Sequence, residues 1–141
     1  MRVVHIKPGL LVDAWRLVEP WVEKAVEKAQ SDESVAAIRW DVLSGTMELI
    51  LVWDDEARKA VGCCILEFTD TQRGKLCNIY LCAGQQFRRW RHLMADIKAH
   101  ARANGCTLLQ AGGRPGWERL LAPDGFRRLR VILEARLDNA E

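Results

Sequence analysis

Three β-prone apolar runs in close succession constrain the fold of this chain more than any other feature. They are Met47–Asp55 (MELILVWDD), Ala60–Asp70 (AVGCCILEFTD) and Lys75–Ala83 (KLCNIYLCA). Only the short turn sequences DDEARK and TQRG separate them. Connections this short join antiparallel neighbours, because a parallel pair needs a crossover of a dozen residues or more. The middle of the chain therefore predicts an antiparallel meander.

The clearest helical pattern follows this meander, over Arg88–Gly105, and Asn104-Gly105 is a suitable C-terminal stop. Its apolar residues recur at i, i+3, i+4, i+7 and i+11: Trp90, Leu93, Met94, Ile97 and Ala101. The next run, CTLLQA, is expected to be a strand. Because a long helix joins the strands before and after it, these two should be parallel within a mixed sheet.

The N-terminal part predicts one strand and then helices. The strand is Val3–Lys7, which Pro8-Gly9 stops. Helical character follows over residues 10–30, where Pro20 is expected to split the helix in two. Ser31-Asp32 is expected to cap a further helix that ends at Gly45.

The C-terminal part predicts a short helix, PGWERLLA, and a final strand, FRRLRVILEARL. The complete order is then β-α-α-β-β-β-α-β-α-β. The fold class is α/β, in the α+β sense of a mixed, mostly antiparallel sheet with helices packed against it. Its fourth and fifth strands should be parallel.

Length and composition favour a single soluble domain, residues 1–141. No window approaches the 18 or more apolar residues of a membrane span, and the N-terminus lacks the apolar region of an export signal. Five cysteines, an odd number, lie within apolar runs, as buried thiols do in a reducing compartment. Their spacing offers no zinc-binding pairs, so no metal is expected. The expected location is the cytoplasm.

Charge is distributed unevenly along the chain. Residues 1–70 carry 8 Lys/Arg against 13 Asp/Glu, whereas residues 71–141 carry 13 against 6. Eleven of those 13 basic residues are arginine, which suits forked contacts to phosphate or carboxylate. Two interpretations stay open: two solvated faces of opposite sign, or an anion site on one side of the molecule.

The predicted order, together with the sequence GGRPGWERLLAPDGFRR, resembles the GNAT superfamily of acyl-CoA-dependent N-acetyltransferases. The resemblance covers Val3–Leu137 and has three local echoes. These are the strand–turn–helix at residues 75–105, the helix exit NGCTLL, and Leu120-Leu121 followed by Gly125-Phe126. The start of the last helix, RPGW, is similar to small GNAT-like proteins of tailed phages. That similarity implies a phage or prophage origin, and then the host cytoplasm.

In this family the turn after the fourth strand follows the pattern Q/R-x-x-G-x-G/A and holds the pyrophosphate of coenzyme A at a helix N-terminus. The resemblance places Gln86 at the first position and arginine, Arg89 and Arg91, at both glycine positions. Long cationic side chains then stand where the backbone would approach the phosphate closely. Gly84 supplies that approach if the alignment shifts by a few residues. The implied cofactor-binding residues are Leu81, Cys82, Ala83, Gln86, Arg88, Arg89 and Arg91.

Acetyl transfer needs a base for the amine proton, and an acid can protonate the leaving thiolate. Candidate bases are Glu67 and Asp70, near the end of the third strand, although each also fits a solvated strand end. The family's acidic tyrosine corresponds to Leu121 here. The chain's single tyrosine, Tyr80, is expected to pack with its hydroxyl satisfied. The acid role is therefore left without a candidate.

The remaining cysteine, histidine and tryptophan residues each have a structural explanation, and for two tryptophans a ligand-binding role is also open. Cys82 is expected to be a buried structural thiol, and the three histidines (His5, His92 and His100) are scattered and expected to be ordinary helix or surface residues. Trp90 and Trp117 are flanked by arginine, so each either packs on a helix face or offers a stacking platform for a base. The resemblance places Arg114 and Trp117 on the acceptor side.

Two functions of different class stay open. The first is an N-acetyltransferase that uses acetyl-CoA, or another acyl-CoA, and modifies a small-molecule or peptide amine. The second is a non-catalytic GNAT-fold protein, such as a phage assembly or virion component, whose arginines contact a partner. Gln86 and the element order favour the first, and Leu121 and the arginines at both glycine positions favour the second. A protein partner or a homodimer fits either function. Nucleic acid is not favoured because no recognised motif is present.

Overall fold

The computed structural model describes residues 1–29, 32–85, 91–113 and 116–138. These residues form five strands, four α-helices and three short 3-10 turns, η1 to η3. In chain order the elements are β1 (Arg2–His5), η1 (Pro8–Leu10), α1 (Leu11–Ala29), α2 (Val35–Leu43), β2 (Glu48–Asp54), β3 (Lys59–Thr71), β4 (Gly74–Gly84), η2 (Arg91–Leu93), α4 (Met94–Ala103), β5 (Leu108–Ala111), α5 (Gly116–Leu121) and η3 (Ala122–Asp124).

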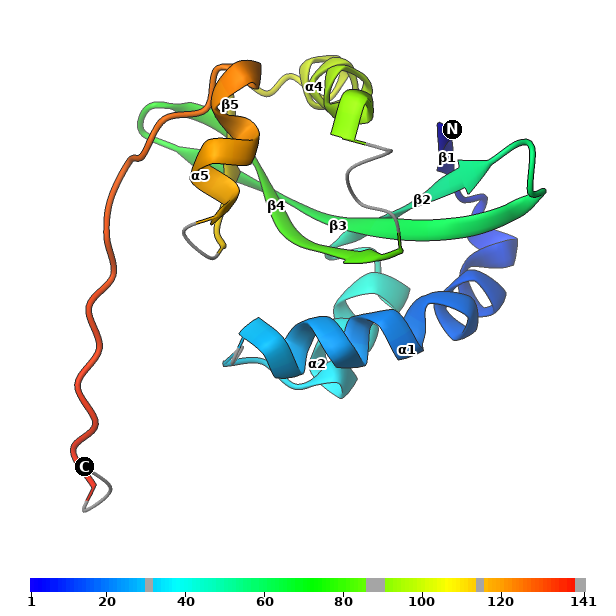
Figure 1. The fold of residues 1–141 in the computed structure, drawn as a ribbon, viewed down its shortest axis with the longest axis horizontal. Coiled ribbons are helices and arrows are strands. Elements are labelled where there is room, and N and C mark those ends of the chain that lie inside the picture. Colours follow the sequence, from blue (N-terminus) through cyan, green and yellow to red (C-terminus); the bar gives the residue numbers. More distant parts are fainter. Residues whose placement is uncertain (30–31, 86–90, 114–115, 139–141) are drawn as a thin grey trace.

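The five strands form one sheet in the order β1-β2-β3-β4-β5. The first three pairs are antiparallel, and β4 pairs with β5 in parallel. In Figure 1, α1 and α2 lie on one face of this sheet and α4 lies on the other. The mixed sheet, the central meander and the parallel final pair are therefore confirmed.

Each face of the sheet carries its own core. The α1-side core joins Trp15 and Val18 of α1 to sheet residues such as Ile65. The α4-side core joins Ile97 of α4 to sheet residues such as Leu66. Because β3 is covered on both faces, its apolar run is nearly continuous rather than alternating. That explains why β3 is the most uniformly apolar run in the chain.

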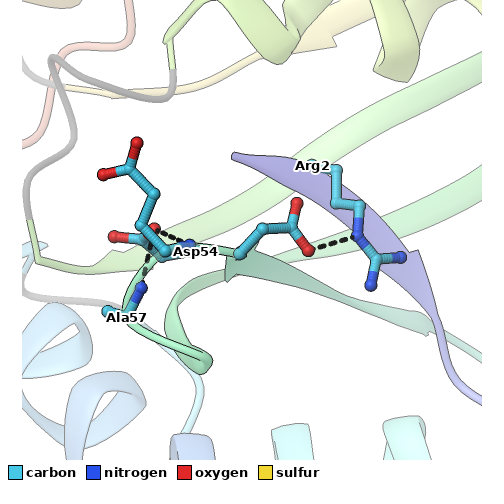
Figure 2. Close-up of polar contacts among 5 residues, drawn as sticks. Arg2, Asp54 and Ala57 are labelled. Atoms are coloured by element: carbon cyan, nitrogen blue, oxygen red, sulfur yellow. Dashed lines mark hydrogen bonds and ion pairs between the residues drawn. The ribbon is translucent and has the colours of Figure 1, made fainter.

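The β2–β3 turn is held by a buried carboxylate. Asp54 is only 6% exposed, and its Oδ1 accepts hydrogen bonds from the backbone N–H groups of Glu56 at 3.0 Å and Ala57 at 3.3 Å. Beside it, Arg2 of β1 donates to Asp55 at 3.0 Å (Figure 2). A side chain that satisfies two turn N–H groups replaces the missing ladder bonds and fixes where β2 ends.

The expected split of the first helix at Pro20 is wrong. Helix α1 continues through Pro20, which is exposed. The buried residues Trp15, Val18 and Val22 form one stripe that passes the proline without interruption. Packing of this stripe on the sheet outweighs the one backbone hydrogen bond that proline removes.

The expected cap of the next helix is also displaced. Helix α2 begins at Val35, and its N-cap is Ser34, whose hydroxyl accepts a hydrogen bond from the Ala37 N–H at 3.1 Å. Ser31 lies outside the described residues. The predicted stop is close, because Gly45 follows the helix with φ +84°, a conformation that glycine adopts without strain.

The final strand is missing from the sheet. Residues 126–138 belong to no strand of the described chain. In Figure 1 they form the orange-to-red segment that leaves the molecule after α5. The fold class is confirmed, but the observed sheet ends one strand short of the predicted order.

Candidate functional site

Strands β4 and β5 pair over only four residues and then part. The pairing runs from Leu76 with Leu108 to Ile79 with Ala111. Strand β4 continues to Gly84, and on its β5 side the segment Tyr80–Gly84 pairs with no described strand. We call this segment the splay. From Leu81 onward, its backbone N–H and C=O groups on that side can bind an extended ligand.

A β-bulge lies at the start of the splay. Ile65 of β3 pairs with Leu81, and the next residue, Leu66, pairs with Ile79, so Tyr80 is the extra residue on β4. The bulge turns two consecutive side chains, Tyr80 and Leu81, toward the α1-side core. Bulges of this kind increase strand twist and help β4 to diverge from β5.

A polar row crosses the sheet just before the splay. Asn78 of β4 is in register with Glu67 of β3 and Gln110 of β5. The Asn78 side-chain amide donates to Glu67 Oε1 at 3.1 Å. All three residues are half-buried, and their chain neighbours pack in the α4-side core, so the row faces the α1 side. The row therefore places a positioned carboxylate beside the splay.

The structure separates the two candidate bases. Glu67 is in register with Asn78, one position from the last β4–β5 pair. Asp70 is in register with Lys75, near the opposite end of β4, and it is exposed. At about 3.3 Å per residue, Lys75 lies roughly 13 Å along the strand from Ile79. Only Glu67 is close to the splay.

A helix follows β4 along the chain, as the family pattern requires. The 3-10 turn η2 begins at Arg91 and leads into α4. The first N–H groups of such a helix have no partner within the helix and carry a partial positive charge, which suits an anion. Gln86, Arg88 and Arg89 lie outside the described residues, as does Arg114.

Solved structures of acetyltransferases are similar to this chain in their overall fold. A probable acetyltransferase aligns over 100% of this chain and 99% of its own, with a TM-score of 0.70 and 16% identity. Glucosamine-6-phosphate N-acetyltransferase from Arabidopsis thaliana aligns over 97% and 98%, with a TM-score of 0.65 and 10% identity. An acetyltransferase from Trypanosoma brucei aligns over 96% and 99%, with a TM-score of 0.63 and 14% identity.

The chain has a GNAT-like fold. No protein-family model matches the sequence, and no curated protein matches it. The likeness therefore lies in the fold, at identities where residue roles do not transfer. Within the described ranges, every helix is too short or too polar to span a lipid bilayer.

Gly84 lies in close contact with the neighbouring strand β3. Gly84 has φ +129°, and a Cβ there would lie 2.4 Å from Gly62 Cα and 2.4 Å from the Val61 carbonyl oxygen. The next residue, Gln85, donates its N–H to that same carbonyl at 2.7 Å. The missing side chain at Gly84 thus permits close contact between β4 and β3, and its role toward a phosphate stays a prediction.

After Tyr80, the splay residues offer backbone rather than reactive side chains. Leu81 and Ala83 pack into the α1-side core. Cys82 Sγ lies 3.3 Å from Cys64 Sγ, and this hydrogen bond, together with burial, raises the pKa of the Cys82 thiol well above its ordinary value. The thiol is therefore protonated at neutral pH, as expected of a structural cysteine and not of a nucleophile.

Helix α5 contributes packing to this part of the fold. Leu121 is buried in the α4-side core, at the position where the resemblance would place an acidic tyrosine. Trp117 is half-buried and packs against the same core. A Cβ on Gly113 would meet Trp117 Cδ1 at 2.9 Å, so the indole covers that glycine. Trp90, the other arginine-flanked tryptophan, lies outside the described residues.

Two histidines that are distant in sequence meet at the other end of α4. The rings of His5 and His100 have centroids 4.5 Å apart, and His100 Nε2 is hydrogen-bonded to Glu48. The nitrogen and oxygen atoms through which these three residues could bind a metal lie within 4.8 Å of one another. Two imidazoles and one carboxylate form a ligand set that zinc binds in other proteins. In the structure His100 and Glu48 pair with each other and join α4 to β2. The expectation that these histidines are scattered is wrong for His5 and His100.

Sequence reasoning missed the position of Tyr80 and of the polar row. The bulge leaves no signature in the run IYLCA, because this run has no alternation of polar and apolar residues that an extra residue would interrupt. Glu67, Asn78 and Gln110 are polar residues inside apolar runs. That shared feature was the one signal that could have grouped them.

Proposed function

We propose that this protein is an N-acetyltransferase that transfers an acyl group from acetyl-CoA, or a related acyl-CoA, to an amine. The observation that carries the proposal is the splay: a bulged β4 diverges from β5 within a GNAT-like fold that acetyltransferases share. Acetyl-CoA supplies the acyl group as a thioester. The remaining chemistry belongs to residues of this chain.

The cofactor fits the donors that the splay offers. The pantetheine arm of coenzyme A contains amide groups that can pair with the unpaired side of the Leu81–Ala83 backbone. The pyrophosphate would lie at the N-terminal end of α4, where Gln86, Arg88, Arg89 and Arg91 follow the strand. Guanidinium groups form forked, charge-assisted hydrogen bonds with phosphate oxygens. In this proposal they replace the glycine-rich cradle.

Glu67 is the proposed base. Its Oε1 accepts a hydrogen bond from Asn78, which fixes the carboxylate beside the splay and leaves Oε2 to accept the proton of the acceptor amine, directly or through one water. Half-burial keeps the carboxylate within reach of solvent. Asp70 is not retained as a base, because it is exposed near the far end of β4.

Tyr80 is the proposed acid for the leaving thiolate. The bulge places it at the start of the splay, and the α5 position implied by the resemblance holds the buried, apolar Leu121. A phenol can donate a proton at this point, whereas leucine cannot. Arg114 and Trp117 are proposed to line the acceptor side.

Calorimetric titration with acetyl-CoA at moderate salt tests the binding step. We expect micromolar affinity in the unaltered protein and a loss of about tenfold or more in Arg89→Ala and in Arg91→Ala, since each removes a charge-assisted contact. Arg102→Ala is the matched control, because Arg102 lies in the last turn of α4 and is exposed. Undetectable binding at high micromolar cofactor would overturn the proposal.

Glu67→Gln tests the chemical step once an acceptor has been found in a panel of amines and peptides. We expect kcat to fall by about 100-fold or more while acetyl-CoA affinity is unchanged. Asp70→Asn is the matched control and should retain activity. Equal loss in both variants, or in neither, would remove Glu67 from the base role.

A non-catalytic GNAT-fold protein is the second candidate, and buried Leu121 is the observation that favours it. In that case the arginine-rich half of the chain contacts a partner rather than a cofactor. Absence of acetyl-CoA binding is its expected result in the titration above. The phage origin and assembly role stay predictions.

A further inference from the structure

Three residues that are far apart in the sequence present metal-binding atoms at one place in the fold. His5 ends β1, Glu48 begins β2, and His100 lies in the last turn of α4. Each offers one imidazole nitrogen or carboxylate oxygen, and these atoms lie within 4.8 Å of one another. We call these three residues the His–Glu–His cluster. The fold therefore assembles a set of donors that no spacing in the sequence predicts.

The pleat of the sheet directs both strand residues of the cluster toward α4. His5 is in register with Ile50, whose side chain packs in the α4-side core. Glu48 lies two residues before Ile50 on β2, and residues two apart on a strand share a face. His100 reaches this face from α4, which lies over it (Figure 1). Two strands and a helix hold the cluster, and such elements position ligands more precisely than loops do.

The cluster is closed on its inner side and open to water on its outer side. The side chains of His100 and Glu48 are 18% and 39% exposed, and His5 is an exposed residue. On the inner side, Phe68 packs against the α4-side core and meets the His100 ring edge-on, with the ring centres 6.2 Å apart. An ion can therefore enter from solvent past His5, while an apolar neighbour limits water on the other side.

The contacts within the cluster need only a small rearrangement to hold an ion. Around a tetrahedral zinc, with bonds of about 2.0–2.2 Å, the ligand atoms lie roughly 3.3–3.5 Å apart. Closing the cluster from 4.8 Å or less therefore needs at most about 1.5 Å of movement. Rotation of the exposed His5 side chain supplies it. Within the described residues, the His5 ring contacts the His100 ring and its nitrogens make no hydrogen bond that the rotation would break.

We propose that His5, Glu48 and His100 bind one zinc ion, with water in the fourth position. The ion replaces the proton in the hydrogen bond between His100 Nε2 and Glu48, and that proton is released to solvent. Zinc suits this set because it accepts imidazole nitrogen and carboxylate oxygen in a four-coordinate site. An ordinary His100–Glu48 ion pair does not require His5, whereas a zinc site uses all three residues. The ion joins β1 and α4 to β2, on the face of the sheet opposite the polar row.

Calorimetric titration of the chelator-treated, full-length protein with zinc chloride under reducing conditions tests this site. We expect one zinc per chain with micromolar or tighter affinity. His5→Ala removes a direct ligand at an exposed position, so affinity should fall by about 100-fold or more. His92→Ala is the matched control, because His92 is an exposed histidine of η2 outside the cluster, and it should keep the affinity. Undetectable binding at about 100 μM zinc, or binding that His5→Ala leaves unchanged, would overturn the proposal.

Thermal unfolding of Glu48→Gln distinguishes a zinc ligand from a structural partner of His100. The amide oxygen still accepts a hydrogen bond from His100 but is a poorer ligand than a carboxylate, so Tm in the presence of chelator should stay close to that of the unaltered protein. Zinc at about 100 times its Kd should raise Tm of the unaltered protein by roughly 5–10 °C. The rise should be largely lost in Glu48→Gln. An equal rise in both proteins would show that the ion binds elsewhere.

Discussion

Gly84 has no room for a side chain, because the backbone of β3 occupies the space where its Cβ would lie. Its φ of +129° is strained for any residue with a side chain. A Cβ at this position would also lie only 2.4 Å from the Cα of Gly62. Gly84 also ends β4, directly after the backbone that we propose binds the cofactor. This one residue therefore fixes where the chain leaves the splay and turns toward α4.

Gly84→Ala should destabilise the protein by roughly 3 kcal/mol, because it combines a strained φ with a backbone clash that no rotamer relieves. Gly112→Ala is the control, since a Cβ there meets nothing within 4 Å, and it should change stability by less than about 0.5 kcal/mol. Urea unfolding followed by circular dichroism measures both. Equal stability of the two variants would show that β3 and β4 can separate at Gly84 without loss.

Residue roles were less predictable from the sequence than residue burial. The expectation that Cys82 is a structural thiol agrees with its contact with Cys64 and its raised pKa. The place of Tyr80 in the bulge could not be predicted, because a bulge is a register relation between two strands. The separation of Glu67 from Asp70 likewise depends on which strand end faces the splay, and only the pairing determines that.

Elements with a strong local signal were predicted closely. The meander follows from apolar runs with short turns between them, and α4 follows from its 3.6-residue period. Pro20 was predicted to split the first helix, but α1 continues through it. Packing of α1 on the sheet outweighs the local effect of one proline. Residues 126–138 show the reverse case. Their sequence has the pattern of a strand, but in the structure they pair with no described strand, and an unpaired segment is not a strand.

Helix α2 gives a prediction at the scale of the element. It has nine residues, and its N-terminus is held by the Ser34 hydroxyl at 3.1 Å from the Ala37 nitrogen. Ser34→Ala should lower the free energy of unfolding by about 1 kcal/mol, because an orphan N–H loses its acceptor. Ser34→Asp keeps an acceptor and should remain within a few tenths of a kcal/mol of the unaltered protein. If urea unfolding gave the same free energy of unfolding for Ser34→Ala and Ser34→Asp, the capping hydrogen bond would contribute nothing to stability.

For the whole molecule, the two cores differ in how completely the chain covers them. Two helices cover the α1 side over β2 to β4, while α4 and α5 cover the other side. Among the described strands, β5 pairs on one side only, and residues 126–138 leave the molecule beside α5 (Figure 1). The sheet is therefore covered on both faces but not along this edge. The backbone amides of β5 should exchange with water before those of β3, which pairs with a strand on each side.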